Sequence, residues 1–134
     1  MKNQLFLLIC CVAVLFTTFS CMVPQNDNTI QNNPPNVPSS PSPVDGAKNL
    51  SRYNVILSWE CSDPDLDPLT FEVYFGTDPT PTNLATITTQ KSYSLGTLNL
   101  GTTYYWRIVA KDDKGAKTSG PVWRFTTTSC PLCQ

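Results

Sequence analysis

Hydrophobic and polar residues alternate most clearly between residues 103 and 111. One face of an extended chain here is aromatic or apolar throughout: Tyr104, Trp106, Ile108 and Ala110. The opposite face is mixed: Tyr105, Arg107, Val109 and Lys111. Because successive side chains of a strand point to opposite faces, this period of two residues predicts a strand with one buried face.

Six further short segments have the alternation or the β-branched composition of strands, and turn-forming Gly, Pro, Asn and Asp separate them. The expected strands are 44–47, 53–60, 69–75, 84–88, 92–95, 103–111 and 122–127. This spacing predicts an all-β fold, a seven-stranded antiparallel sandwich over residues 44–128. Its expected core is aromatic: Trp59, Phe71, Phe75, Tyr104, Trp106, Trp123 and Phe125.

The first 20 residues have the pattern of an export signal. Lys2 gives a weakly positive start, and an unbroken apolar run follows from residue 5 to residue 16. A helix that spans a membrane needs ~20 apolar residues, so this run is short for a span. We therefore expect residues 1–20 to form a secretory signal peptide.

A cysteine follows this signal directly, and the junction resembles a bacterial lipobox. The resemblance implies that Cys21 is diacylated and becomes the first residue of the mature protein. The sequence departs from the usual pattern at Thr18, where lipoboxes carry Leu, and at the bulky Phe19. Ordinary signal cleavage near residue 20 and an uncleaved membrane anchor are the alternatives to lipidation.

The residues after this cysteine are polar and rich in proline up to residue 43. Such a segment cannot bury a core, so a disordered, partly polyproline tether is expected. The chain then divides into a lipoprotein signal peptide (1–20), a lipidated cysteine with its tether (21–43), the sandwich (44–128) and a tail (129–134). This layout predicts a protein of the cell envelope that its lipid holds at a membrane, outside the cytoplasm.

Several motifs of the expected sandwich resemble a fibronectin type III domain. Leu98-Asn-Leu-Gly-Thr-Thr-Tyr104 looks like its tyrosine corner, and Trp59 looks like its core tryptophan. Segments 71–75 and 120–127 resemble its third and last strands. Fibronectin III repeats of bacterial exported proteins carry Asp-Pro-Asp-Gly-Asp-Pro-Leu-Thr, where this chain has Leu66 in place of Gly. The resemblance implies an immunoglobulin-like sandwich, as found in bacterial exported lipoproteins.

The composition argues against several classes of function. A formal net charge of -1 provides no basic field for nucleic acid. The sequence has no His, which is the commonest general base and metal ligand. It also lacks a nucleophile elbow and a Gly-rich phosphate loop. We therefore expect no enzyme activity, no nucleic-acid partner and no cofactor apart from the cation considered next.

Five aspartates fall on two loops that a fibronectin III sandwich places at one pole: Asp63, Asp65, Asp67, Asp112 and Asp113. Alternate carboxylates on a loop can converge on Ca²⁺, which takes six to eight oxygen ligands. Asp and Pro are also ordinary turn residues, and Leu66 replaces the flexible Gly, so turn formation without a metal is the alternative explanation of these loops.

A second candidate site is the outward face of the third and sixth expected strands. Tyr74, Tyr105 and Arg107 lie there, and exposed tyrosines can stack on a sugar or anchor a protein partner. Alternatively, these residues are cross-strand pairs that stiffen the sheet.

Cys130 and Cys133 form a C-x-x-C motif beyond the last expected strand. No second such motif and no His completes a metal site. A local Cys130–Cys133 disulfide or two free thiols are expected. An inter-chain disulfide and a zinc site shared between chains remain alternatives. Cys61 is expected at the opposite pole, too far away to pair with either.

Two functions fit these features. The first is a membrane-anchored lipoprotein outside the cytoplasm whose fibronectin III-like module binds an extracellular protein or glycan. The second is a structural spacer, or a subunit of an envelope complex, without a ligand of its own.

Overall fold

The computed structural model describes residues 31–130, and nine strands lie in this range. In chain order they are β1 (Ser39–Ser42), β2 (Ala47–Leu50), β3 (Ile56–Glu60), β4 (Leu69–Gly76), β5 (Leu84–Thr88), β6 (Ser92–Ser94), β7 (Thr103–Asp112), β8 (Lys117–Ser119) and β9 (Trp123–Thr127). Within residues 31–130, no helix has the length and apolarity to cross a membrane. The expected signal peptide and Cys21 lie outside the described residues.

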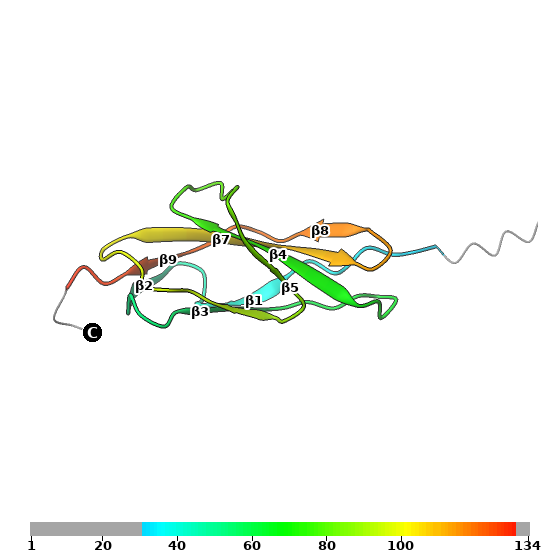
Figure 1. The fold of residues 1–134 in the computed structure, drawn as a ribbon, viewed down its shortest axis with the longest axis horizontal. Coiled ribbons are helices and arrows are strands. Elements are labelled where there is room, and N and C mark those ends of the chain that lie inside the picture. Colours follow the sequence, from blue (N-terminus) through cyan, green and yellow to red (C-terminus); the bar gives the residue numbers. More distant parts are fainter. Residues whose placement is uncertain (1–30, 131–134) are drawn as a thin grey trace, which may run out of the picture. The chain divides into compact units, whose positions relative to one another are not determined.

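The strands form two sheets (Figure 1). The small sheet has the order β1-β3-β6, and the large sheet has the order β2-β9-β7-β4-β5 with β8 on β7. All pairings are antiparallel except that of β2 with β9, which is parallel. The predicted all-β sandwich is therefore confirmed, while its seven all-antiparallel strands are not the observed set.

The two additional strands lie where none was expected. β1 falls in the expected tether, and β8 falls between the sixth and seventh expected strands. β2 begins three residues after the start of the first expected strand. Between β1 and β2 the chain crosses from the small sheet to the large one, and Gly46 adopts a φ of 79° there. Between β8 and β9, Pro121 has no backbone N–H to donate. Gly120 N–H still donates to Ile108 O at 2.8 Å, so the chain stays beside β7 across the gap.

Part of the expected tether belongs to the domain. Residues 31–43 pack on the sandwich, since β1 pairs with β3 and the Pro38 ring is fully buried. A Cβ built on Gly120 would lie 3.2 Å from Pro38 Cβ and 3.2 Å from Ile108 O. Glycine therefore allows the N-terminal segment to approach this closely, and the domain begins before the expected residue 44.

The core lies between the sheets and is aromatic, as the alternation predicts. Trp59 of β3 meets Phe71 of β4 edge-on, with ring centroids 5.5 Å apart. Six of the seven expected core aromatics are buried: Trp59, Phe71, Tyr104, Trp106, Trp123 and Phe125. Phe75 is half-buried and stacks on Tyr104 at 5.1 Å.

The tyrosine corner is also confirmed. The Tyr104 hydroxyl oxygen accepts a hydrogen bond from Asn99 N–H at 2.9 Å. The buried Thr127 hydroxyl holds the same loop, because Oγ1 accepts from Thr102 N–H at 3.0 Å and donates to Asn99 O at 2.7 Å. These bonds fix the loop that leads into β7.

Candidate functional site

The loop between β3 and β4 is built around Asp63. Its Oδ1 accepts hydrogen bonds from Asp65 N–H at 2.8 Å and Asp67 N–H at 3.3 Å. The side chain is buried, and only 6% of the residue is exposed. This is the local role of Asp in a turn, since its carboxylate replaces the backbone acceptors that the turn lacks.

Asp112 does the same for the loop between β7 and β8. Its Oδ1 accepts from Lys114 N–H at 3.0 Å and Ala116 N–H at 2.8 Å. Its Oδ2 accepts from the Asn32 side-chain amide at 2.8 Å. The Asn32 hydrogen bond lowers the pKa of Asp112, so the buried carboxylate is ionised at neutral pH.

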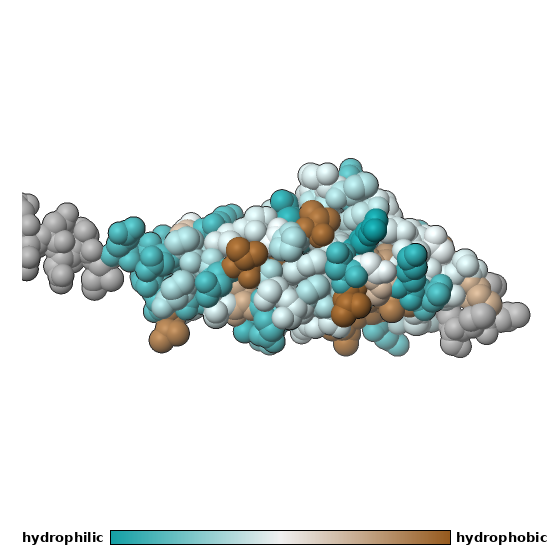
Figure 2. Space-filling view, turned by 180° about the vertical axis from the view of Figure 1, so that it is seen from behind, coloured by the Kyte–Doolittle hydropathy of each residue, from teal (hydrophilic) through white to brown (hydrophobic). Residues whose placement is uncertain are grey.

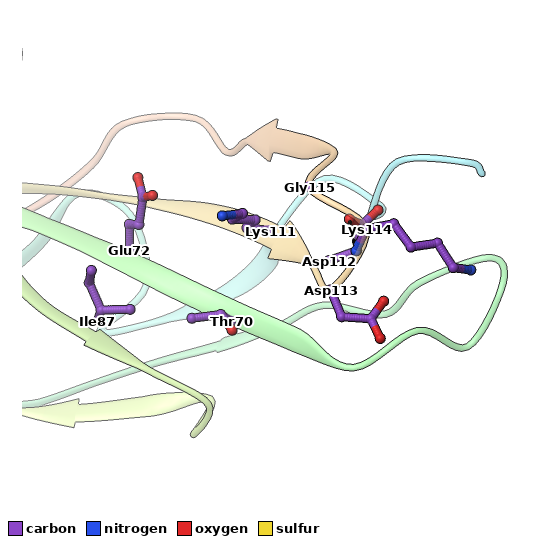
Figure 3. A pocket seen from close by; sticks show the side chains of 8 residues that line it. All are labelled: Thr70, Glu72, Ile87, Lys111, Asp112, Asp113, Lys114 and Gly115. Atoms are coloured by element: carbon purple, nitrogen blue, oxygen red, sulfur yellow. Dashed lines mark hydrogen bonds between the residues drawn. The ribbon is translucent and has the colours of Figure 1, made fainter.

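The fold brings three of the five predicted aspartates together. One carboxylate oxygen from each of Asp63, Asp67 and Asp112 lies within 4.8 Å of the other two. Asp65 instead accepts hydrogen bonds from the backbone and side-chain amides of Asn33, at 2.6 and 2.9 Å. Asp113 lies outside this cluster, and its carboxylate points away from Asp112 (Figure 3).

One ammonium group neutralises part of this charge. Lys114 Nζ lies 2.8 Å from both carboxylate oxygens of Asp67. The Lys114 side chain is 48% exposed, whereas that of Asp67 is 12% exposed. The hydrogen bond with Asp67 raises the pKa of Lys114.

The incoming N-terminal segment completes this pole, which sequence reasoning missed. Besides the bonds of Asn32 and Asn33, the Asn36 amide donates to Ser62 Oγ at 3.0 Å. Cys61 Sγ donates to Asn36 O at 3.2 Å, and burial raises the pKa of this thiol. The asparagines between the prolines of the expected tether are the sequence feature that could have indicated this docking, since their amides make the hydrogen bonds to the pole.

Leu66 sits between Asp65 and Asp67 with a φ of 63° and is 89% exposed. A left-handed backbone costs a residue with a Cβ ~1–2 kcal/mol, and glycine avoids this cost. We expect Leu66→Gly to stabilise the domain by about 0.5–1 kcal/mol, after allowance for the greater freedom of unfolded glycine. Urea unfolding measures this change. Leu66→Ala keeps the Cβ and should give no gain, so equal gains in both variants would contradict the explanation.

The predicted binding face lies on the outer side of the large sheet. Tyr74 and Arg107 are partners in the register of β4 and β7, and the guanidinium lies 5.0 Å from the centre of the tyrosine ring. The Tyr74 hydroxyl donates to Glu72 Oε2 at 2.9 Å, and Lys117 Nζ lies 2.6 Å from Glu72 Oε1. The hydrogen bond to Lys117 lowers the pKa of Glu72, and that to Glu72 raises the pKa of Tyr74.

Tyr105 lies two residues before Arg107 on the same face of β7, opposite Gly76 on β4 and Arg124 on β9. It lines a hollow of ≈ 230 Å³ with Gly46, Lys48, Thr103, Arg124 and Thr126. A larger hollow of ≈ 390 Å³ lies toward the aspartate loops (Figure 3). Its lining residues are Thr70, Glu72, Ile87, Lys111, Asp112, Asp113, Lys114 and Gly115.

Hydrophobic residues on the face shown in Figure 2 form separate patches among polar ones. No single continuous apolar area covers that face of the described residues.

The cysteines of the tail are described only in part. Cys130 is disulfide-bonded, whereas Cys133 lies outside the described residues, so the pairing of these two stays a prediction. Cys61 is a buried free thiol beside the aspartate loops.

Among the solved structures that this domain resembles are two fibronectin III structures. The fibronectin(III)-like modules of Clostridium thermocellum CbhA are 19% identical, with a TM-score of 0.58 over 72% of this chain and 100% of that chain. The fibronectin type-III domain of human fibronectin type III domain containing protein 3 is 18% identical, with a TM-score of 0.50. The match covers 79% of this chain and 99% of that chain. No family model and no curated protein matches the chain. The described domain therefore has the fibronectin type III fold.

Proposed function

We propose that the chain is a lipoprotein held outside the cytoplasm by a diacylated Cys21. Its fibronectin III domain would be a non-enzymatic module that binds an extracellular protein or glycan. The observation that supports binding is the outer face of the large sheet, where Tyr74, Arg107 and Tyr105 are only half-buried. Aromatic rings beside guanidinium groups are typical of recognition surfaces.

The charge on this face favours an anionic ligand. Arg107, Lys111 and Lys117 lie there, and Arg124 lines the hollow beside Tyr105. Glu72 provides the one outward carboxylate on strands β4, β7, β8 and β9. An acidic protein surface or a uronic-acid glycan would match this arrangement.

The second candidate function is a spacer without a ligand. Tyr74 favours it, because its hydroxyl is already bonded to Glu72 and its ring is already covered by Arg107. Such cross-strand contacts stiffen a sheet without any partner.

Binding by the full chain to immobilised uronic-acid and neutral oligosaccharides, and to whole cells, separates the two functions. The Tyr74→Ala/Tyr105→Ala double variant should weaken binding at least ~10-fold while unfolding near the parent, since a central aromatic contact is worth ~2 kcal/mol. Tyr53→Ala is the matched control, because Tyr53 is exposed and stacked under Arg52 but lies off this sheet. Absent binding, or equal binding by all variants, would favour the spacer.

The anchor has its own test, an intact mass of the protein from detergent-phase membranes. A mature chain that starts at Cys21 and carries the mass of a diacylglycerol supports the proposed anchor. A chain cut near residue 20 without lipid would make the protein a secreted module instead.

A further inference from the structure

Two buried oxygen atoms at the aspartate pole lack a partner among the described residues: Asp63 Oδ2 and Asn32 Oδ1. Both atoms can only accept, so each needs a donor or a cation. Asp63 is more than nine-tenths buried, and its other oxygen already serves two backbone N–H groups. Native structures rarely leave a buried carboxylate oxygen unsatisfied.

We propose that this pole binds one Ca²⁺ ion through the carboxylates of Asp63, Asp67 and Asp112 and the side-chain oxygen of Asn32. The three carboxylate oxygens lie within 4.8 Å of one another. Two oxygens bound to one Ca²⁺ at ~2.3–2.6 Å can be no more than ~5 Å apart, and all three oxygen–oxygen distances meet this condition. The Asn32 amide is already placed at the cluster by its 2.8 Å bond to Asp112.

Lys114 alone does not satisfy this cluster. Its ammonium is bound to both oxygens of Asp67, and Asp63 Oδ2 remains without a partner. Three carboxylates within this distance carry more negative charge than one ammonium neutralises. Because the Lys114 side chain is half-exposed, it can move into solvent when an ion takes its place.

The ligand chemistry selects a hard cation. All proposed ligands are carboxylate or amide oxygens, which suit Ca²⁺ and not a thiophilic metal. The ligands also come from loops of irregular geometry, which the adaptable coordination of Ca²⁺ tolerates better than the octahedron of Mg²⁺.

The ion would join three segments that are distant in sequence. Asn32 belongs to the incoming N-terminal segment, Asp63 and Asp67 to the loop after β3, and Asp112 to the end of β7. Binding would therefore fasten the entry of the chain to the pole of the sandwich.

Calorimetric titration of the EDTA-stripped full chain with CaCl₂ tests this inference. We expect one site with a Kd of about 10⁻⁴–10⁻³ M, the range of extracellular modules. At 10 mM Ca²⁺ the melting temperature should then rise by about 5 °C or more. The assignment would be overturned if CaCl₂ produced neither a heat of binding nor a rise in melting temperature. It would also be overturned if Mg²⁺ changed both quantities as much as Ca²⁺ does.

Matched variants locate the site. Asp63→Asn keeps an oxygen for the two loop N–H groups but removes the charge, and should weaken Ca²⁺ binding at least ~10-fold. Asp67→Asn is the second variant, because Asp67 accepts no backbone hydrogen bond among the described residues and its loss should spare folding. Lys114→Met should tighten binding, since it removes the competing ammonium.

Asp113→Asn is the charge-matched control, because Asp113 is on the same pole but outside the cluster. Its Kd should stay within about threefold of the parent, as an exposed charge is largely screened. If Asp63→Asn and Asp67→Asn bind like the parent, or if all three aspartate variants weaken equally, the ion is not held by this cluster and the proposal fails.

Discussion

Trp106→Ala should cost about 3–5 kcal/mol of unfolding free energy, the range for loss of a buried tryptophan. Trp106 is fully buried in the middle of β7, where β4 and β9 flank it. Its ring lies 4.7 Å from that of Trp123. Truncation leaves a cavity that the two neighbouring strands cannot close without losing their register. A domain of this size has only ~5–15 kcal/mol in total, so most of its stability would be lost.

Urea unfolding followed by far-UV circular dichroism measures this loss without depending on tryptophan emission. Tyr105→Ala is the internal control, because the adjacent side chain points outward and is half-exposed. It should cost about 1 kcal/mol or less. Equal midpoints for Trp106→Ala and the parent would refute the core assignment.

Thr127→Val is expected to cost about 2 kcal/mol although it conserves the shape of the side chain. The buried hydroxyl joins Thr102 N–H and Asn99 O, and valine can satisfy neither group. Those groups lie on the loop that also carries the hydrogen bond to Tyr104. The substitution therefore isolates the hydrogen bonds of this corner from its packing.

Thr126→Val provides the comparison in the same denaturant series. The Thr126 hydroxyl pairs with that of Thr103 at 2.9 Å on the half-exposed face of the sheet. Water can replace that partner, so the expected cost is within ~0.5 kcal/mol. A similar loss in both threonine variants would show that the Thr127 bonds have no special role.

The half-buried strands were predictable from sequence because one side of each faces a core. The alternation places β4, β7 and β9 within one or two residues of their observed bounds. It also identifies the tyrosine corner, since Tyr104 follows the turn that the corner requires. The two aspartate loops were expected at one pole, and the approach of Asp63 to Asp112 confirms this.

The N-terminal segment was not predictable in the same way. Composition predicts that residues 31–43 form no core of their own, but it does not exclude docking on another core. The buried Pro38 lies close beside Gly120, where a Cβ would be crowded, and these residues are far apart in sequence. The bond from Asn32 to Asp112 likewise spans 80 positions, so no local pattern signals it.

The parallel pairing of β2 with β9 has a mechanical consequence. Gly46 N–H donates to Arg124 O at 2.8 Å, and Thr128 N–H donates to Leu50 O at 2.8 Å. Because β2 and β9 are parallel, the chain enters β2 and leaves β9 at opposite ends of the pair, so tension between those two ends runs along both strands. The hydrogen bonds between the two strands then carry the load at the same time, because the force acts along the strands. In an antiparallel pair pulled apart from one end, the bonds would instead break one after another. A domain stretched between its two ends would therefore yield at a higher force than its thermodynamic stability alone suggests.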